Sequence, residues 1–292
     1  MGISFRQTGL TFNILHLGIA PVAIFEPLGP HRWQPTALAA GPFAGLQGGA
    51  VASLLTAEIE ALADQRKWGT AITSSAWFLR PTPMTVLRTA LSVVAEGGRV
   101  SVVDNTLWPD GEDQPSATVR VTLSRERAVE VSGFAEPASD AADPERFPVR
   151  TTRAAHGRPW FMDAMEAREG DGVAWFRMNQ SIIDGAGPMS SLPLSSVLGP
   201  ADWTHGIARP FRDVVADPNP NLTVQLLRRP EGRWIGIRAQ AKWRPAGGLG
   251  AGSGVLLDIN GEIGRVSMSV ILVPFPGSPK PESAAGPVPA SN

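Results

Sequence analysis

A pair of glycines at the start of a helical pattern is the first feature of this sequence that could do chemistry. Gly48 and Gly49 stand in GPFAGLQGGAVASLLTAEIEAL, residues 41–62. The first amides of a helix have no partner within the helix and carry a partial positive charge, so they can hold an anion or a polarised carbonyl oxygen. Glycine lets another group approach that backbone closely because it has no Cβ. The pair therefore marks either a tight packing junction or a binding site built from backbone N–H groups.

Other residue types that commonly carry chemistry are absent or scattered. The chain has 292 residues and no cysteine, which excludes disulfides, thiolate metal ligands and a cysteine nucleophile. Its four histidines are His16, His31, His156 and His205, and no pair of them has the spacing of a common metal site. The glycine-rich GLGAGSG at 248–254 lies between two strand-like stretches and does not open a helix. We expect a loop there and not a nucleotide site.

Length, charge and hydropathy narrow the architecture and the partners. A chain of 292 residues is about right for two domains. The net charge of −1 gives no reason to expect nucleic acid or an anionic membrane as a partner. MGISFRQTGL lacks the pattern of a secretory signal, and no apolar run approaches the roughly 18 residues that a membrane span needs. We therefore expect a cytoplasmic protein, either a monomer or a homo-oligomer.

An internal repeat is the strongest organisational signal in the chain. Three landmarks recur at nearly one offset: Pro81 with Pro230, the glycine pair 97–98 with 247–248, and Gly111 with Gly261, at offsets of 149, 150 and 150 residues. This period is far above the 20 to 50 residues of solenoid repeats. The pattern indicates a duplicated domain.

Each copy offers one helix and several strands. Residues 233–243 alternate between apolar and polar side chains, which is typical of a half-buried strand. Helical spacing predicts one helix from 50 to about 66 and another from 194 to about 207, and Pro200 must kink or interrupt the second. One helix lying across an antiparallel sheet, present twice, suggests that the two sheets join side by side.

Composition shifts set the expected domain boundaries. We expect a first unit over 1–130, a polar, proline-bearing connector over 131–154, and a second unit over 155–273. The last stretch, 274–292, is rich in proline and has almost no large apolar residue, which predicts a disordered tail.

Six segments, taken in order, resemble the thioesterase-like double hot-dog family. They are GPFAGLQGGAVASLL, AWFLRPTP, GGRVSVVDNTLWPDG, ADWTHGIARP, NPNLTVQLLRRPEGRWIGI and GVLLDINGEIGRVSMSVILV. The resemblance covers roughly residues 20–273. It implies an α+β fold with two antiparallel sheets, each wrapping one central helix. It also implies a hydrolase of lipid metabolism that cleaves acyl-CoA substrates to free acid and CoA, with no metal and no covalent cofactor.

The same resemblance implies the roles of several residues. The catalytic aspartate of the family lies in the helix region of the second half, where this chain has Asp202, and such a carboxylate can activate water. The amides near Gly48 and Gly49 would polarise the thioester carbonyl, and a preorganised donor of this kind contributes about 3 kcal/mol.

The family also has a hydroxyl or amide residue early in the strand after this helix. The choices here are Asn219, Asn221 and Thr223, and we take Asn219 as the candidate.

The family pattern departs at the last strand, GRVSMSVILV, which has no glutamine. Met268 or Ser269 falls at that position, depending on register, and only one of them can point inward. Ser269 could supply one hydrogen bond, so it is a further candidate, whereas Met268 could supply almost none.

Two alternative functions follow. The first is a catalytically weak or silent hot-dog protein that binds acyl thioesters. The second is a hot-dog dehydratase or hydratase that pairs Asp202 with His205, although their spacing does not resemble that family's motif.

Overall fold

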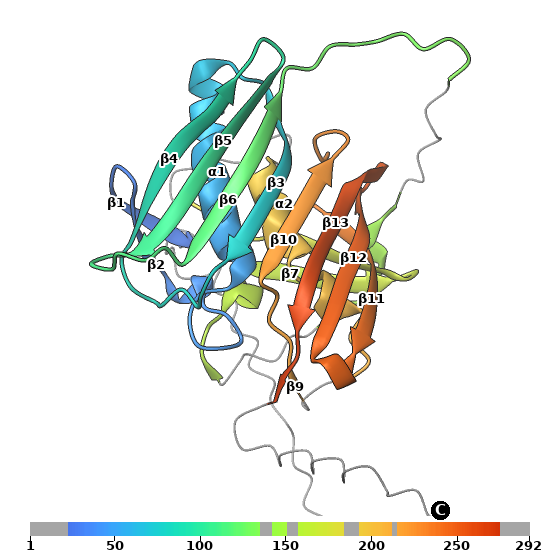
Figure 1. Ribbon diagram of the computed structural model, residues 1–292. Helices are drawn as coiled ribbons and strands as arrows, with labels where there is room; N and C mark the ends of the chain where they lie inside the picture. The colour runs from blue at the N-terminus through green and yellow to red at the C-terminus, as the bar shows by residue number, and fades with distance from the viewer. Residues whose placement is uncertain (1–22, 135–141, 151–156, 184–192, 212–214, 275–292) are drawn as a thin grey trace, which may run out of the picture.

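One continuous antiparallel sheet organises the chain (Figure 1). The computed structural model describes residues 23–134, 142–150, 157–183, 193–211 and 215–274. Twelve strands follow the order β1-β2-β4-β5-β6-β3-β10-β13-β12-β11-β8-β7.

The elements fall into two groups along the chain. The first half contains β1 (Phe25–Gly29), β2 (Arg32–Pro35), α1 (Gly48–Arg66), β3 (Thr70–Phe78), β4 (Leu87–Glu96), β5 (Val100–Pro109) and β6 (Ala117–Ser124). The second half contains β7 (Met165–Gly170), β8 (Val173–Met178), α2 (Leu194–Ala201), α3 (Thr204–Ile207), β10 (Asn221–Leu226), β11 (Ile235–Arg244), β12 (Leu249–Asp258) and β13 (Gly261–Ile271). The short strands β9 (Val215–Ala216) and β14 (Val273–Pro274) pair separately. Short 3-10 turns cover Ala37–Ala39, Pro144–Arg146, Phe161–Ala164 and Pro245–Gly247.

The two halves of the sheet have the same strand order when each is counted from its outer edge to the centre. β3 and β10 pair at the centre, and each is followed outward by the third, second and first strands of its own meander and then by a hairpin. The sequence landmarks occupy matching places: Pro81 follows β3 and Pro230 follows β10, and each glycine pair lies between the first two meander strands. This arrangement agrees with the predicted duplication and with sheets joined side by side.

Both main helices lie on the same face of the sheet and pack against each other (Figure 1). α1 is buried over most of its circumference, which suits its small and apolar residues, such as Ala50, Leu54 and Ile59. The Glu60 carboxylate of α1 accepts hydrogen bonds from the Leu194 and Ser195 amides at the start of α2, with N···O distances of 2.8 and 3.2 Å. These bonds satisfy two of the amides that the start of a helix leaves without an internal partner.

Several boundaries differ from the sequence-based expectations. α1 begins at Gly48, two residues before the predicted start, and the second helical region is divided into α2 and α3 after Pro200. The predicted loop at 248–254 is wrong, because residues from Leu249 onward form β12. Gly250, Gly252 and Gly254 are every second residue of that strand, so all three lie on the same face of the sheet.

The outer hairpins of the two halves, β1–β2 and β7–β8, were not predicted. In the predicted connector, Glu145 forms ion pairs with Arg168 and Arg177 and so fastens residues 142–150 to the second half. The predicted tail lies outside the described residues from 275 onward. Within the described ranges, no helix is both long and apolar enough to cross a membrane.

Candidate active site

Asp202 is a buried carboxylate at the C-terminal end of α2, where only 2% of the residue is exposed. Three uncharged donors hold it. The Gly49 amide and Gln47 Nε2 each donate to Oδ2 over 2.8 Å, and Asn219 Nδ2 donates to Oδ1 over 2.7 Å. Gln47 and Gly49 belong to the first half of the chain, so the carboxylate is held from both halves.

The glycine pair lies where α1 meets Asp202. A Cβ at Gly49 would lie 2.8 Å from Asp202 Cβ and 3.1 Å from Gly199 Cα, and a Cβ at Gly48 would lie 3.0 Å from the ring of Phe78. Gly49 therefore allows the two helices to pack closely, whereas a side chain at Gly48 would crowd the ring of Phe78. The Gly49 amide does bind an anionic group, as expected at a helix start, but this group is the carboxylate of Asp202. This corrects the expectation that it is directed at a substrate carbonyl.

Of the three candidates on the following strand, the structure brings Asn219 to Asp202. Its Nδ2 also donates to the Asn221 carbonyl over 3.1 Å, which fixes the side chain. Asn221 instead accepts a bond from the Ser269 amide through its Oδ1. Thr223 Oγ1 donates to Ser75 across the central seam of the sheet.

The structure does not bring Ser269 to Asp202. Val266, Met268 and Val270 point inward along β13 and are buried, whereas Ser269 is exposed on the opposite face. Because side chains alternate along a strand, the inward position belongs to Met268 and a role for Ser269 beside Asp202 is excluded by geometry.

Gln47 is the residue that the sequence analysis missed. It is buried and is the N-cap residue of α1, directly before Gly48. The strand β13 of this chain lacks a glutamine. The amide side chain of Gln47 nevertheless reaches Asp202 from the first half of the fold. The available signal was its place next to the glycine pair at the predicted helix start.

His205 lies one turn beyond Asp202, in α3. Its Nδ1 is 3.0 Å from the sulfur of Met268, and its Nε2 is 3.6 Å from Oδ2 of Asp217. The guanidinium of Arg209 donates to Oδ1 of Asp217 over 2.5 Å. Neither nitrogen of the imidazole is hydrogen-bonded to Asp202, so the geometry gives no support for a direct Asp202–His205 pair.

A family model matches the second half of the chain. Residues 126–267 match the acyl-CoA thioesterase C-terminal domain. The chain carries a thioesterase-like double hot-dog fold. This confirms the predicted α+β fold class and the predicted family resemblance.

Solved structures share the thioesterase-like fold along nearly their whole length. A candidate thioesterase II from Thermobifida fusca is 16% identical with a TM-score of 0.65, covering 85% of this chain and 94% of that one. A protein with a hot-dog fold from Alicyclobacillus acidocaldarius is 16% identical with a TM-score of 0.64, covering 84% and 93%. An acyl-CoA thioesterase II from Mycobacterium marinum is 14% identical with a TM-score of 0.59, covering 88% and 97%. At these identities the likeness shows the fold. No curated protein matched the sequence.

Burial sets the electrostatics of the site in this thioesterase-like fold. Burial raises the pKa of Asp202 above its ordinary value, and the charge of nearby His205 and the bonds from Asn219 and Gly49 oppose that rise. Burial lowers the pKa of His205, and the carboxylates of Asp217 and Asp202 oppose that fall. A buried carboxylate with a raised pKa is suited to take a proton from water near neutral pH. In the described part of the chain, no three acidic or histidine side chains converge as metal ligands.

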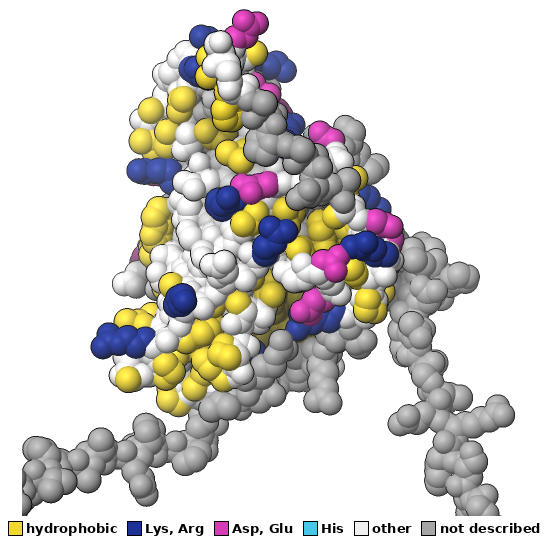
Figure 2. All heavy atoms as spheres, turned by 90° about the vertical axis from the view of Figure 1, so that its right-hand side faces the viewer, with side chains coloured by type: hydrophobic (Ala, Val, Ile, Leu, Met, Phe, Trp, Pro, Cys, Tyr) yellow, Lys and Arg dark blue, Asp and Glu magenta, His cyan; other side chains and the backbone are white. Residues whose placement is uncertain are grey.

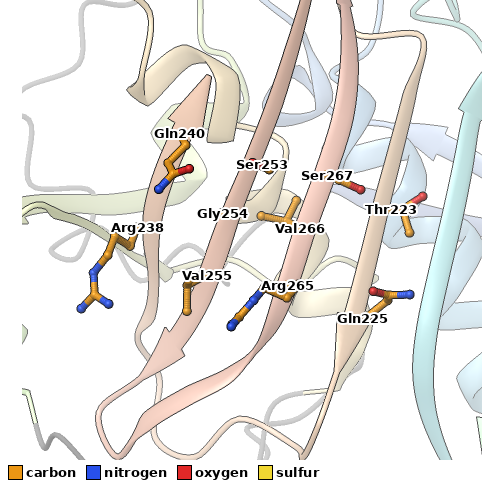
Figure 3. Close-up of a pocket in the computed structure, with 10 residues that line it drawn as sticks. All are labelled: Thr223, Gln225, Arg238, Gln240, Ser253, Gly254, Val255, Arg265, Val266 and Ser267. Carbon is orange, nitrogen blue, oxygen red and sulfur yellow. The ribbon is translucent and has the colours of Figure 1, made fainter. Parts of the chain in front are cut away.

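Two adjoining hollows of about 360 and 470 Å³ lie on the outer face of the sheet, away from α1 and α2. Polar and cationic side chains from β10, β11, β12 and β13 line the first of them (Figure 3). Ser269 lies in the second hollow, which separates it from Asp202. On the face of the molecule that Figure 2 shows, acidic and basic side chains are interspersed and form no broad basic patch.

Proposed function

We propose that this protein hydrolyses acyl-CoA thioesters to a free acid and coenzyme A. The observation that carries the proposal is the buried Asp202 carboxylate, held by uncharged donors from both halves of a thioesterase-like fold. The fold alone does not set an activity, so the proposal rests on the chemistry of this carboxylate.

Asp202 acts as a general base on water. An ionised carboxylate has about four acceptor sites. The Gln47 and Gly49 donors use two on Oδ2 and Asn219 uses one on Oδ1, so Oδ1 retains a site for a water molecule. As the water oxygen forms a bond to the acyl carbon, its proton passes to Asp202. The tetrahedral intermediate then breaks its C–S bond, and the departing sulfur takes the proton from Asp202 to give the thiol, which restores the carboxylate.

The start of α1 stabilises the developing oxyanion through Gly48. The Gly49 amide is engaged by Asp202, but Gly48 is partly accessible and its amide has no partner among the residues that the structure describes. Gly48 has no side chain, so an acyl carbonyl can approach that amide next to Asp202. A donor of this kind contributes about 3 kcal/mol to the transition state.

The test is turnover of a panel of acyl-CoA esters, followed by thiol release, for the wild type and Asp202→Asn. The protein has no cysteine to contribute background thiol. We expect slow hydrolysis by the wild type that falls at least about tenfold in Asp202→Asn, because an amide cannot accept the proton. Circular dichroism confirms that the variant is folded. Equal background rates for both folded proteins with every ester would overturn the proposal.

A second candidate function is binding of acyl thioesters without turnover. Met268 favours it, because a thioether stands at the inward position of β13 where the family pattern has a glutamine amide. In that case acyl-CoA binds to wild type and Asp202→Asn with equal affinity in calorimetry, and neither releases thiol. Detectable Asp202-dependent turnover would eliminate this alternative.

A further inference from the structure

His205 is held in one position by the strands beneath it. A Cβ at Gly252 on β12 would lie 3.1 Å from His205 Cβ and 3.3 Å from its Cα, so glycine at 252 allows α3 to approach the sheet this closely. On β13, the sulfur of Met268 lies 3.0 Å from Nδ1. The glycine-rich stretch at 248–254 thus has a structural role beneath this imidazole.

The other nitrogen of His205 faces a buried carboxylate. Asp217 is 4% exposed and its Oδ2 lies 3.6 Å from Nε2. Oδ2 accepts no hydrogen bond from the described residues, while Oδ1 is bonded to Arg209. A buried carboxylate oxygen without a donor is costly. A protonated imidazole at Nε2 offsets that cost, so Asp217 favours the charged form of His205.

Asp202 and His205 are neighbours on one helical turn. The backbone at Asp202 and Trp203 is right-handed helical, and the Ile207 amide bonds back to the Trp203 carbonyl. Side chains three residues apart on such a turn share a face. The charged groups around the imidazole are Asp202 from α2, Asp217 from the segment before β10, and Arg209 from the segment after α3. β12 and β13 contribute the uncharged Gly252 and Met268.

We propose that His205 is a positioning residue that sets the pH range over which Asp202 works as a base, with Asp217 orienting the imidazole. The inference rests on the proposed function of Asp202. When His205 takes up a proton, its positive charge favours the ionised form of Asp202, and the base remains available at lower pH. When His205 is lost, Asp202 must ionise in the same buried place without that charge.

The first test is the pH dependence of kcat/KM for wild type, His205→Gln and Asp217→Asn, with His31→Gln as a control far along the chain. We expect the acidic limb to move to higher pH in His205→Gln and by a smaller amount in Asp217→Asn, and to stay in place in His31→Gln. A merely structural role lowers the rate at every pH and leaves the limb in place, which would overturn the inference while leaving the hydrolase proposal intact.

The second test requires no turnover. NMR titration follows the His205 imidazole, assigned by its loss in His205→Gln, in the wild type and in Asp202→Asn. We expect the pKa of His205 to fall in Asp202→Asn, because one of the two carboxylates that favour its charged form is removed. Identical titration curves would overturn the coupling, even if the protein hydrolyses acyl-CoA. A shifted curve without hydrolysis would instead retain the coupling and reject the proposed function.

Discussion

Asp202 and Gly49 lie 153 residues apart in the sequence and share a hydrogen bond of 2.8 Å between carboxylate and amide. The bond fastens the end of α2 to the start of α1. The candidate base therefore exists only when both halves of the chain are folded and packed together, which couples the stability of the helix pair to the chemistry of the site.

The helix contact at Gly49 can be tested by adding a single methyl group. In Gly49→Ala the new Cβ meets Asp202 Cβ and the backbone of Gly199, which cannot move aside as a flexible side chain could. We expect a loss of about 1 to 3 kcal/mol in the free energy of unfolding, measured by urea denaturation. Gly98→Ala is the control, because a Cβ there has nothing within 4 Å. Equal stability of the two variants would show that the helices can separate without cost.

The Asn219 contact predicts a loss of activity that an outer-face substitution does not share. Asn219→Ala removes the donor to Asp202 Oδ1, so the carboxylate can rotate away from the orientation that holds water. We expect kcat to fall by about tenfold to a hundredfold, the usual effect of misplacing a reacting group by about 1 Å. Ser269→Ala should leave kcat unchanged, since Ser269 lies on the opposite face of β13. A loss of kcat in Ser269→Ala with Asn219→Ala unaffected would reverse the assignment.

Gln47 gives a prediction in which charge and hydrogen bonding can be separated. Gln47→Glu places a second carboxylate next to Asp202 Oδ2, and like charges raise the pKa of a shared site. We expect the acidic limb of the kcat/KM profile to move to higher pH. Gln47→Met, which removes the donor without adding charge, separates the two effects and should move the limb less. Superimposable profiles for the three proteins would place Gln47 outside the working site.

The buried carboxylate also predicts how stability changes with pH. The pKa of Asp202 is raised in the folded state, so its favourable contribution is fully present below the unfolded pKa of about 3.9 and is lost as pH rises through the folded pKa. Between the unfolded and the folded pKa of Asp202, we expect the Tm of the wild type to fall relative to that of Asp202→Asn. Above the folded pKa, the difference in Tm should stay constant. Calorimetry of both proteins from acid to neutral pH measures the gap. Parallel curves would show that Asp202 keeps its ordinary pKa.

Much of the fold could be predicted because it depends on local alternation and on repetition within the chain. The strands around 233–243 and the central helix followed from spacing, and the duplication followed from matched prolines and glycines. β12 could not be predicted as a strand from its glycines, because their alternation has meaning only once His205 packs above Gly252. From sequence alone glycine indicates a loop, because the group that packs against it in the fold is not known.

Only part of the candidate site could be predicted from the sequence, because some of its contacts join residues that lie far apart in the chain. Asp202 and Asn219 could be proposed from family resemblance, and the structure brings them together. Gln47 could not, because its contact with Asp202 spans 155 residues and depends on how α1 and α2 are placed. Ser269 was a choice between two registers, and the one-residue difference between it and Met268 decides which face of the sheet each occupies.

The reciprocal capping of the helices has a genetic consequence. In a symmetric dimer one gene encodes both subunits, so any mutation at a helix end changes that end in both subunits. Here the start of α1 binds Asp202 and the start of α2 binds Glu60, and each carboxylate is encoded separately. A single base change can alter one helix end while its counterpart continues to hold the pair together. Fusion of the two halves thus allows the two helix ends to change independently of each other.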